Sequence, residues 1–521
     1  MVCGFTTEGL GAMPDDILSI YAASQPDKPA VIDDRPGGAV VSWTYAELEA
    51  QSNRVANLLL ALGALPRANI LWCGPNSPDV VAVMGATRKI GAVAVPLNYR
   101  LTPDEALYVI NHSDAEIAYV DHEHLPLFEA LTGQLEKVRH IIVVGGPAPD
   151  GLLGATDITA ASAIAPAVAE QPGGSMIYTS GTTGKPKGIA RPLPVPAGED
   201  MEPQPFTVLW GWQPDDVHLL CGPAYHTAPG NYALSHLHEG ARVVIMPRFD
   251  ATTCLELIET ERVTTSHMVP ANFVRLLEVD WARYDRSSIR KILHAAAPCP
   301  VAVKRKIMEV FPPGTVWEYF GMSEGFVSSI SPEDWLAKPG SVGIPMPGIT
   351  VKILDEDGSE LAPGEVGYIY VSALSGFRFE YYNAADKNAA TWRDDFYTVG
   401  DLGSLDADGF LFIADRRVDL VISGGVNIYP AELEGVLAEH PEVVDSAVFG
   451  LPDEKMGQRV HALVEVRPGT RVSEEELLAF LGQRLAKFKL PRAIELVGEL
   501  PREPSGKVLK RQLRDERVSA P

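Results

Sequence analysis

The chain has 521 residues, of which 46% are hydrophobic and 21% are charged, and its formal net charge is −24. This composition is ordinary for a folded globular protein, and the length predicts two or more domains, because single cores stop growing near about 250–300 residues. The acidic balance argues against nucleic acid as a partner, since binding to phosphate backbones needs basic stripes.

The sequence shows neither a recognisable targeting signal nor a cysteine pattern typical of metal or disulfide sites. Residues 1–16 lack the basic segment and apolar core of a secretory signal, and no apolar run reaches the roughly 18 residues needed to cross a bilayer. The five cysteines are scattered and form no C-x-x-C pair, so neither a metal site nor a disulfide framework is expected. We therefore expect a cytoplasmic protein with no transmembrane segment, and the sequence leaves homo-oligomer formation open.

Helix and strand patterns alternate through the first third of the chain. Residues 44–62 predict an amphipathic helix, with Thr44 and Glu47 spaced as a capping box. Further helices are expected at 78–90 and 102–112, and strands at 69–73, 92–96, 115–120 and 140–144. Strands separated by helices of this length indicate βαβ units and a mostly parallel sheet, and the alternation returns over 216–247 and 251–296.

The stretch 178–188 reads Tyr-Thr-Ser-Gly-Thr-Thr-Gly-Lys-Pro-Lys-Gly and follows an apolar strand pattern. Glycines let the backbone approach an anion closely, and consecutive N–H groups form an anion-binding concavity. The spacing is not that of a Walker A loop, which needs four residues between its glycines. We predict a phosphate-binding loop, the alternative being a flexible linker. Its residues are Thr179, Ser180, Gly181, Thr182, Thr183, Gly184 and Lys185, with Lys187 nearby.

With this loop the chain resembles the adenylate-forming superfamily, which includes acyl-CoA synthetases, luciferases and peptide-synthetase adenylation domains. Family-like segments recur in the family's order over nearly the whole chain. The resemblance implies an α/β protein with a large N-terminal domain, residues 1–417, whose αβ layers carry parallel-rich sheets and a β-rich subdomain. It also implies a small, mobile C-terminal α+β domain, residues 418–521. The proline-rich stretch 191–196 departs from relatives, which usually continue there with a helix.

The last third of the sequence fits this division. Turn signals at 357–358 and 363–364 break a strand-like alternation over 351–370 and predict a hairpin-rich region. Beyond residue 417, helix patterns at 430–439 and 473–487 accompany strand patterns at 443–449 and 459–466. About 100 residues is a sufficient length for a small domain.

Two central segments resemble parts of the family's nucleotide site. Residues 318–324 resemble its Tyr-Gly-Met-Thr-Glu segment, with Phe320 where a tyrosine is usual; this ring would stack on adenine. Ser323 would lie near the α-phosphate, and Glu324 would bind Mg²⁺ unless it is only a surface acid. Segment 294–298 resembles the small-residue lining of the adenine and acyl pocket, or is a tightly packed strand end. The other implied residues are Glu318, Tyr319, Gly321, Met322, Ala296, Ala297 and Pro298.

Three more residues match family positions. Asp401 resembles the aspartate that accepts from both ribose hydroxyls, as one carboxylate can. Arg416 would contact ribose or phosphate, or would form a structural salt bridge. His226 matches the gate beside the acyl pocket, and its alternative is a core histidine bonded to backbone.

Lys507 matches the family's catalytic lysine, which reaches the α-phosphate and the carboxylate during adenylation. The sequence around it predicts a helix with Ser505 as N-cap that runs toward Arg517. Lys507 would then lie in the first turn, where a cation opposes the helix dipole. Composition alone would favour a solvated lysine in a basic tail.

The acceptor of the activated group is less well defined. Gly424 and Gly425 resemble the glycine turn that lets the pantetheine arm of CoA approach. In relatives the small domain rotates about an Asp or Lys, but Val418 occupies that position here, and valine is stiff. Either the pivot lies at Arg417 or Asp419, or the rotation is restricted.

Together these motifs predict an ATP-dependent ligase that activates a carboxylic acid as acyl-AMP and passes the acyl group to CoA. The expected substrates and cofactors are ATP, Mg²⁺, CoA and a small-molecule carboxylic acid. One alternative activates nitrite for an aromatic amine, and another passes the acyl group to a carrier protein. A third is a non-catalytic nucleotide-binding protein, which would not need Lys507 and Glu324.

Overall fold

The computed structural model describes residues 16–34, 40–167, 169, 173–179, 186–190, 205–372, 378–417, 419–503 and 506–519. The proline-rich stretch 191–196 and Val418 lie outside these residues. The chain forms two compact units: residues 1–178, 190–218 and 230–247 make the first, and residues 179–189, 219–229 and 248–521 make the second. Among the described helices, none is both long and apolar enough to cross a bilayer.

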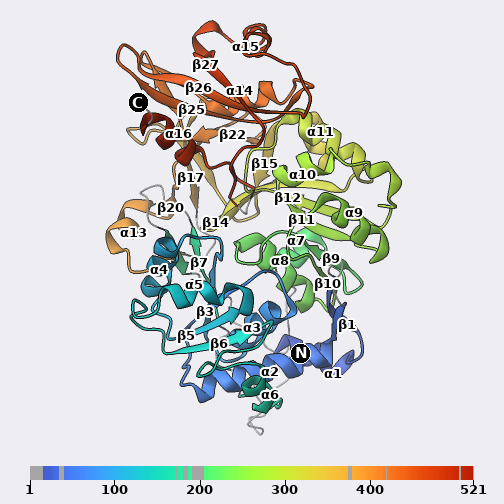
Figure 1. Ribbon diagram of the computed structural model, residues 1–521. Coiled ribbons are helices and arrows are strands. Elements are labelled where there is room, and N and C mark those ends of the chain that lie inside the picture. The colour runs from blue at the N-terminus through green and yellow to red at the C-terminus, as the bar shows by residue number, and fades with distance from the viewer. Residues whose placement is uncertain are drawn as a thin grey trace, which may run out of the picture. The chain divides into compact units, whose positions relative to one another are not determined.

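A parallel sheet of four strands forms the centre of the first unit (Figure 1). Its strands follow the order β4 (Val93–Leu97), β3 (Asn69–Cys73), β5 (Ile117–Asp121), β6 (His140–Val144). All pairings between them are parallel, and the strands are buried along most of their length, as expected for a sheet covered on both faces. The predicted strands and their parallel arrangement are confirmed.

Capped helices connect these strands, as the sequence predicted. In helix α2 (Tyr45–Ala61), Thr44 Oγ1 accepts from the Glu47 amide at 3.2 Å, and Glu47 Oε2 accepts from the Thr44 amide at 2.8 Å. Helices α3 (Pro78–Lys89) and α4 (Pro103–His112) begin with a proline after a serine or threonine cap. The remaining elements of this unit are α1 (Ile17–Ser24), β1 (Pro29–Asp33), β2 (Val41–Thr44), η1 (His122–His124), α5 (Leu125–Ala130), α6 (Ala155–Ala160), α7 (Pro205–Trp210) and β10 (Arg242–Ile245).

The second unit contains a mixed sheet that changes from parallel to antiparallel pairing. Strands β11 (Thr265–Met268), β12 (Lys291–His294) and β13 (Val316–Met322) are parallel. From β13 onward every neighbouring pair is antiparallel, in the order β14 (Gly325–Ile330), β15 (Ser341–Pro345), β22 (Leu411–Arg416), β21 (Asp401–Leu405), β17 (Gly367–Ser372). Strand β16 (Val351–Leu354) pairs with β17 antiparallel, which confirms the predicted hairpin region.

Shorter elements complete this part of the second unit. Its helices are α9 (Ala251–Thr260), α10 (Pro270–Leu276), η2 (Trp281–Arg283), α11 (Val301–Val310), α12 (Pro332–Ala337) and α13 (Ala385–Thr391). Its short strands are β18 (Glu380–Tyr381), β19 (Trp392–Arg393) and β20 (Phe396–Tyr397). Four elements at the unit boundaries are β7 (Met176–Thr179), β8 (Lys187–Ala190), β9 (Val217–Leu220) and α8 (Thr227–His238).

Residues 419–519 build a smaller sheet with helices on both faces (Figure 1). Alternate residues of the long strand β25 (Val443–Asp453) point to opposite faces: Val448 packs with α14 (Pro430–Leu437) and α15 (Glu474–Gly482), whereas Phe449 packs with Leu513 of α16 (Lys510–Ser519). The other elements are β23 (Val421–Ser423), β24 (Val426–Ile428), β26 (Gly457–Val466), η3 (Lys487–Lys489) and β27 (Ala493–Val497).

The helix predicted from Ser505 is wrong in its start. Ser505 lies outside the described residues, and α16 begins only at Lys510. Before it, the chain folds back on itself: Arg502 and Val508 form an antiparallel bridge, and the Gly506 amide donates to the carbonyl of Glu503. Gly506 has a φ of +83°, which a residue inside a helix cannot adopt. Lys507 therefore lies in a turn. The helix predicted at 473–487 also ends early, at Gly482.

Candidate active site

Ser323 and Glu324 form the tip of the hairpin between β13 and β14. Met322 pairs with Gly325, so these two residues make a tight turn that pushes their side chains beyond the sheet. The Ser323 and Thr227 hydroxyls lie 2.9 Å apart. Glu324 is partly exposed, and its Oε1 accepts a hydrogen bond from Tyr381 Oη at 2.8 Å. The hairpin thus presents one hydroxyl and one carboxylate at a single point.

The predicted phosphate loop is described only at its two ends. Ser180, Gly181, Thr182, Thr183, Gly184 and Lys185 lie outside the described residues. Thr179 ends β7 and Lys187 begins β8. The Lys187 Nζ lies 5.7 Å from the centre of the Tyr381 ring, and partial burial lowers the pKa of its ammonium while the carboxylate of Glu324 opposes that shift. The end of the loop therefore approaches the Glu324 hairpin.

Lys507 is partly buried among charged groups of the second unit. Burial lowers the pKa of its ammonium, and the positive charge of Arg416 adds to this effect. The carboxylates of Glu503, Asp401 and Glu324 act in the opposite direction. Asp401, Arg416 and Glu324 therefore lie within electrostatic reach of Lys507, although they are distant from it in the sequence.

His226 lies within electrostatic reach of Lys507. Burial, together with the charge of Lys507, lowers the pKa of its imidazole to about 4, so the ring is neutral near pH 7. Its Nε2 is buried and has no hydrogen-bond partner among the described residues. The backbone amide of His226 donates to the Pro223 carbonyl at 3.0 Å, and the imidazole packs against the Tyr225 ring, with centroids 4.7 Å apart. Such a nitrogen can accept or donate one hydrogen bond to a ligand.

Asp401 and Arg416 face each other across strands β21 and β22. Arg416 Nε donates to Asp401 Oδ1 at 3.1 Å, so the salt bridge considered as an alternative is present. The Asp401 side chain is 7% exposed, and burial raises the pKa of its carboxyl against the pull of Arg416 and Lys507. The arginine occupies one carboxylate oxygen. A contact of either residue with ribose or phosphate stays a prediction.

The two segments expected at the adenine differ in how their side chains are engaged. Glu318 is buried, and its Oε2 accepts from Lys304 Nζ at 2.5 Å. The Tyr319 hydroxyl lies 3.0 Å from His267 Nε2. In contrast, Phe320, Gly321 and Met322 are only partly buried. Ala296 and Pro298 are exposed and Ala297 is partly buried, and Ala296 holds a φ of +77°, a strained value for a residue with a side chain.

The glycine turn forms a hairpin beside a charged pocket. Ser423 pairs with Val426, and Gly424 and Gly425 between them have φ values of +58° and +80°, as a two-residue hairpin of this type requires. The Gly424 amide donates to the carbonyl of Met456, which lines a pocket of about 270 Å³.

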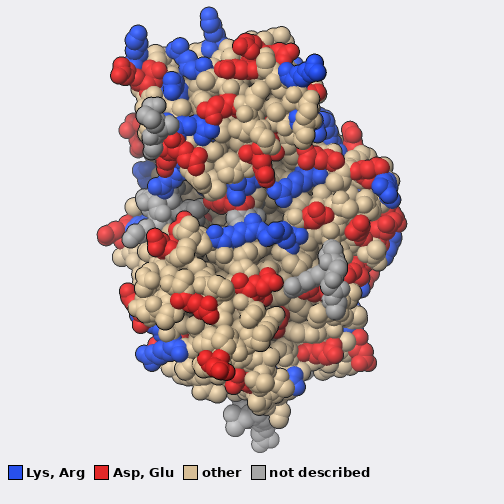
Figure 2. All heavy atoms as spheres, in the orientation of Figure 1, with Lys and Arg blue, Asp and Glu red and all other residues tan. Residues whose placement is uncertain are grey.

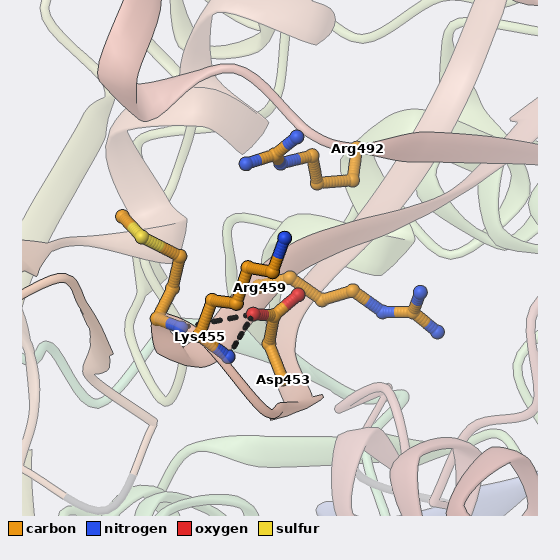
Figure 3. A pocket seen from close by; sticks show the side chains of 5 residues that line it. Asp453, Lys455, Arg459 and Arg492 are labelled. Carbon is orange, nitrogen blue, oxygen red and sulfur yellow. Dashed lines mark hydrogen bonds between the residues drawn. The ribbon is translucent and has the colours of Figure 1, made fainter.

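This pocket, shown in Figure 3, is mainly cationic. Its lining residues are Asp453, Lys455, Met456, Arg459 and Arg492. Asp453 Oδ1 accepts from the amides of Lys455 and Met456, which fixes the turn between β25 and β26, and Arg492 lies on the opposite side of the pocket. Three cationic side chains and one carboxylate that is already hydrogen-bonded therefore line the pocket.

The carboxylate of Glu324 has the chemistry expected of a Mg²⁺ ligand. Among the described residues no group of three or more histidine, cysteine or acidic side chains could hold a metal alone. Mg²⁺ is usually bound by one or two carboxylates together with substrate phosphates, so a single partly exposed carboxylate is a suitable donor.

Figure 2 shows acidic and basic side chains interspersed on the visible face.

Three residues near this site were missed by the sequence reasoning. Thr227 contacts Ser323, Lys304 neutralises Glu318, and Tyr381 holds Glu324. Each lies between 14 and 96 positions from its partner. Their only sequence signals were a threonine next to His226, a lysine in an amphipathic helix pattern and an aromatic-rich stretch at 379–382, none of which indicates a partner.

Comparison with known proteins connects this geometry to a family. The model of the AMP-binding enzyme family matches residues 18–378, and that of the AMP-binding enzyme C-terminal domain matches residues 432–507. The chain is 31% identical to the fatty acid–[acyl-carrier-protein] ligase ScoC of Streptomyces coeruleorubidus, over 95% of both chains. It is 33% identical to the long-chain-fatty-acid–CoA ligase FadD13 of Mycobacterium tuberculosis, over 91% of this chain and 93% of that one.

Solved structures agree with this relationship. The crystal structure of the anthranilate CoA ligase AuaEII in complex with anthranoyl-AMP matches with a TM-score of 0.84 and 27% sequence identity. The match covers 96% of each chain, so the similarity extends over both family segments.

Proposed function

Because the chain belongs to the AMP-binding enzyme family of adenylate-forming ligases, we propose that it joins a carboxylic acid to the thiol of CoA in two ATP-driven steps. In the first step the acid attacks the α-phosphorus of ATP, giving acyl-AMP and pyrophosphate. In the second step the CoA thiol attacks the acyl carbon and releases AMP. The proposal includes a C-terminal domain that begins near residue 418.

The first step is supported by the ion pair of Arg416 with Asp401 and by the electrostatic influence of Arg416, Asp401 and Glu324 on Lys507. Adenylation concentrates negative charge at the α-phosphorus, and preorganised cations stabilise such charge where water is excluded. Lys507 and Arg416 supply these cations. Glu324 would hold Mg²⁺ with the phosphates, and that ion supplies further charge neutralisation when bound.

Asp401 has a different task in the proposal. Its free oxygen would accept from ribose and so fix the nucleoside relative to Lys507. Burial raises the pKa of this carboxyl, whereas Arg416, in contact with it, favours its charged form. The neutral His226 would line the acyl side, where a buried cation beside Lys507 would be unfavourable.

The cationic pocket next to Gly424 and Gly425 favours CoA as the acceptor. CoA carries phosphate groups at the far end of its pantetheine arm, and arginine forks match phosphate oxygens. Lys455, Arg459 and Arg492 supply that charge beside the turn that would meet the arm. An aromatic amine, the acceptor in the nitrite alternative, has no phosphate that would need these residues.

The test is a pyrophosphate-release assay with a panel of fatty and aryl acids, with nitrite as a separate arm. We expect acid-dependent release, followed by thioester formation on addition of CoA. The same assay with a phosphopantetheine-loaded carrier protein separates free CoA from a carrier, the acceptor named for ScoC. Nitrite-dependent AMP release with an aryl amine, and no thioester with any acid, would overturn the proposal.

Pocket variants sharpen the test of the acceptor. Arg459→Ala together with Arg492→Ala is expected to raise the KM for CoA about 10-fold or more and to leave pyrophosphate release unchanged. Arg484→Ala is the matched control, since this exposed arginine of the same region does not line the pocket. Equal effects on both half-reactions would contradict the assignment of the pocket to the acceptor.

A further inference from the structure

A phenol holds the carboxylate at the tip of the β13–β14 hairpin. Tyr381 Oη donates to Glu324 Oε1 at 2.8 Å. Tyr381 is only 4% exposed, whereas Glu324 is partly exposed at the turn. Within the described part of the chain, Glu324 accepts a hydrogen bond at Oε1 and none at Oε2, so these contacts fix one of its two oxygens. Such a division of the two oxygens suits a carboxylate that binds a cation with one of them.

Tyr381 is itself held rigidly. Asn388 Oδ1 accepts from the Tyr381 amide at 2.7 Å, and Asn388 Nδ2 donates to the Tyr381 carbonyl at 2.9 Å. The buried ring of Phe379 packs edge-on against the Tyr381 ring, with centroids 5.4 Å apart. The Thr391 side chain lies close to the phenol and opposes the rise in its pKa that burial causes. These contacts fix the backbone, the ring and the hydroxyl of Tyr381, so the hydroxyl keeps one direction.

The same stretch also contacts the strand after the predicted phosphate loop. The Tyr382 amide donates to the Gly188 carbonyl at 2.8 Å. Next to Gly188, Lys187 places its ammonium 5.7 Å from the Tyr381 ring centre. Tyr381 and Tyr382 therefore join two segments that the proposed function assigns to the phosphates and the metal, the strand β8 and the Glu324 hairpin. A displaced phenol would disturb both.

We propose that Tyr381 is a positioning residue that orients the Glu324 carboxylate toward the divalent cation bound with the phosphates of ATP. Hydrogen-bond partners of ligating carboxylates commonly set their orientation, and their loss costs roughly 10–100-fold in metal affinity or activity. The inference rests on the proposed role of Glu324 as the metal ligand. The alternative is that Tyr381 only fills the core, in which case its hydroxyl would not affect the metal.

The variant Tyr381→Phe removes the hydroxyl and keeps the ring that packs on Phe379 and faces Lys187. The affinity of the full-length enzyme for Mn²⁺ is expected to fall about 10-fold. Electron paramagnetic resonance in the presence of α,β-methylene-ATP measures this affinity. The affinity for the same nucleotide in EDTA is expected to stay unchanged. In the pyrophosphate-release assay the half-saturating Mg²⁺ concentration should rise by a similar factor, and high Mg²⁺ should restore the rate.

Two comparisons separate a positioning role from a structural one. Tyr370→Phe, on the partly exposed face of β17, is the control for loss of a tyrosine hydroxyl and should leave Mn²⁺ binding as in the wild type. Thr391→Val keeps the shape and removes only a hydroxyl close to the phenol, so it should weaken Mn²⁺ binding by a smaller factor. If Tyr381→Phe fails to fold, this second variant still tests the proposal.

The outcomes also distinguish this inference from the proposed function. Unchanged Mn²⁺ binding in Tyr381→Phe, or an equal loss of nucleotide affinity with and without metal, refutes the positioning role while acid-dependent pyrophosphate release still supports the ligase. Unchanged Mn²⁺ binding in Glu324→Gln refutes the metal assignment on which the inference depends. Loss of binding in Glu324→Gln and partial loss in Tyr381→Phe, rescued by metal, is the result we expect.

Discussion

Replacing Lys304 by methionine should destabilise the protein strongly, because it leaves a buried carboxylate without its cation. Lys304 Nζ donates to Glu318 Oε2 at 2.5 Å, and the two side chains are 0% and 8% exposed. The Lys304 ammonium also lies 4.7 Å from the centre of the Trp335 ring. His294 Nε2, 3.6 Å from Glu318 Oε2, cannot replace the lysine, since burial lowers the pKa of its imidazole.

The size of the effect follows from the burial of the pair. Breaking a buried ion pair by removing one partner costs about 3–5 kcal/mol, whereas replacing both partners by apolar residues of similar volume is often neutral. At about 2–4 °C per kcal/mol, the single variant Lys304→Met should lower the Tm by roughly 6–20 °C. Lys304→Met combined with Glu318→Leu should recover most of that loss, because no charge then stays buried.

The pH dependence of this loss has a defined sign. Burial raises the pKa of Glu318 above its usual value, and without Lys304 nothing nearby would oppose the shift. Between the unfolded and folded pKa values the folded protein binds more protons, so stability falls as pH rises through that window. Thermal melts of Lys304→Met should therefore show a smaller loss at pH 5 than at pH 8.

Circular-dichroism melts of the wild type, both single variants and the double variant provide the assay. Lys306→Met, two positions away on the exposed side of α11, controls for the loss of a lysine. A Tm of Lys304→Met within 2 °C of the wild type (a threshold of about 1 kcal/mol) would refute the buried-pair reasoning. A double variant no more stable than Lys304→Met would refute it equally.

Four further predictions concern the site. Lys507→Ala should abolish acyl-AMP formation and spare thioester formation from preformed acyl-AMP, and equal loss of both half-reactions in single-turnover assays would contradict its role. His226→Phe should reduce the acid sensitivity of folding, because the pKa of His226 is about 4 in the folded protein and 6.5 in the unfolded chain. The unfolded wild type therefore binds a proton first as the pH falls, and the free energy of unfolding decreases by at most about 3 kcal/mol through that window. Urea titrations at pH 7 and pH 5 measure this decrease, which should be absent in the variant. Ala296→Gly should relieve the strain of the positive φ and raise the free energy of unfolding by about 1 kcal/mol, which corresponds to a few degrees in Tm. Ala296→Val should lower the Tm. Gly506→Ala should slow adenylation at least about 10-fold, since its new Cβ would lie 2.8 Å from that of Ala271 and would displace Lys507; an unchanged rate would refute this constraint.

Features with a local cause were predictable from the sequence. The Thr44 and Glu47 capping box needs only residues three apart, and it forms as expected. The hairpin at 351–372 was indicated by turn residues between alternating segments. The residues drawn together around Lys507 were predictable only through the family resemblance, because no local pattern relates Asp401 or Glu324 to a lysine about 100 or more positions away.

Features that depend on distant contacts were missed or wrong. The helix predicted from Ser505 had a suitable cap residue, yet Gly506 takes a positive φ and packs against Ala271, so tertiary contact overrides local preference. The sequence could not assign a role at the site to Tyr381, because its pattern does not distinguish this tyrosine from a residue of the hydrophobic core. The carboxylate that accepts a hydrogen bond from its hydroxyl, that of Glu324, lies 57 positions away in the sequence.

The contacts around Val418 bear on the rotation that the resemblance implies. Arg417 is anchored to the preceding part of the chain, since its amide donates to the Gly400 carbonyl at 2.9 Å and its Nε donates to the Tyr368 hydroxyl at 3.2 Å. A change in φ at Arg417 would move its side chain and break the bond to Tyr368, whereas the amide precedes that rotation and would keep its bond to Gly400. The Asp419 amide donates only to the Arg416 carbonyl, which closes a turn. A pivot displaced from the stiff valine would therefore cost less at Asp419 than at Arg417.

Rotation about Asp419 would still have to release Asp415. Asp415 Oδ2 accepts from the Ala431 amide at 3.0 Å, and Lys510 opposes the rise in the pKa of this buried carboxyl. Lys510 and its partner Glu434, 2.7 Å apart, both follow the pivot and would move together, whereas Asp415 precedes it and would stay behind. The rotation would thus remove one hydrogen bond and one neighbouring cation from Asp415, which is unfavourable unless water reaches the carboxylate. Hydration of Asp415, more than the stiffness of Val418, would then set the free energy of the change between the two half-reactions.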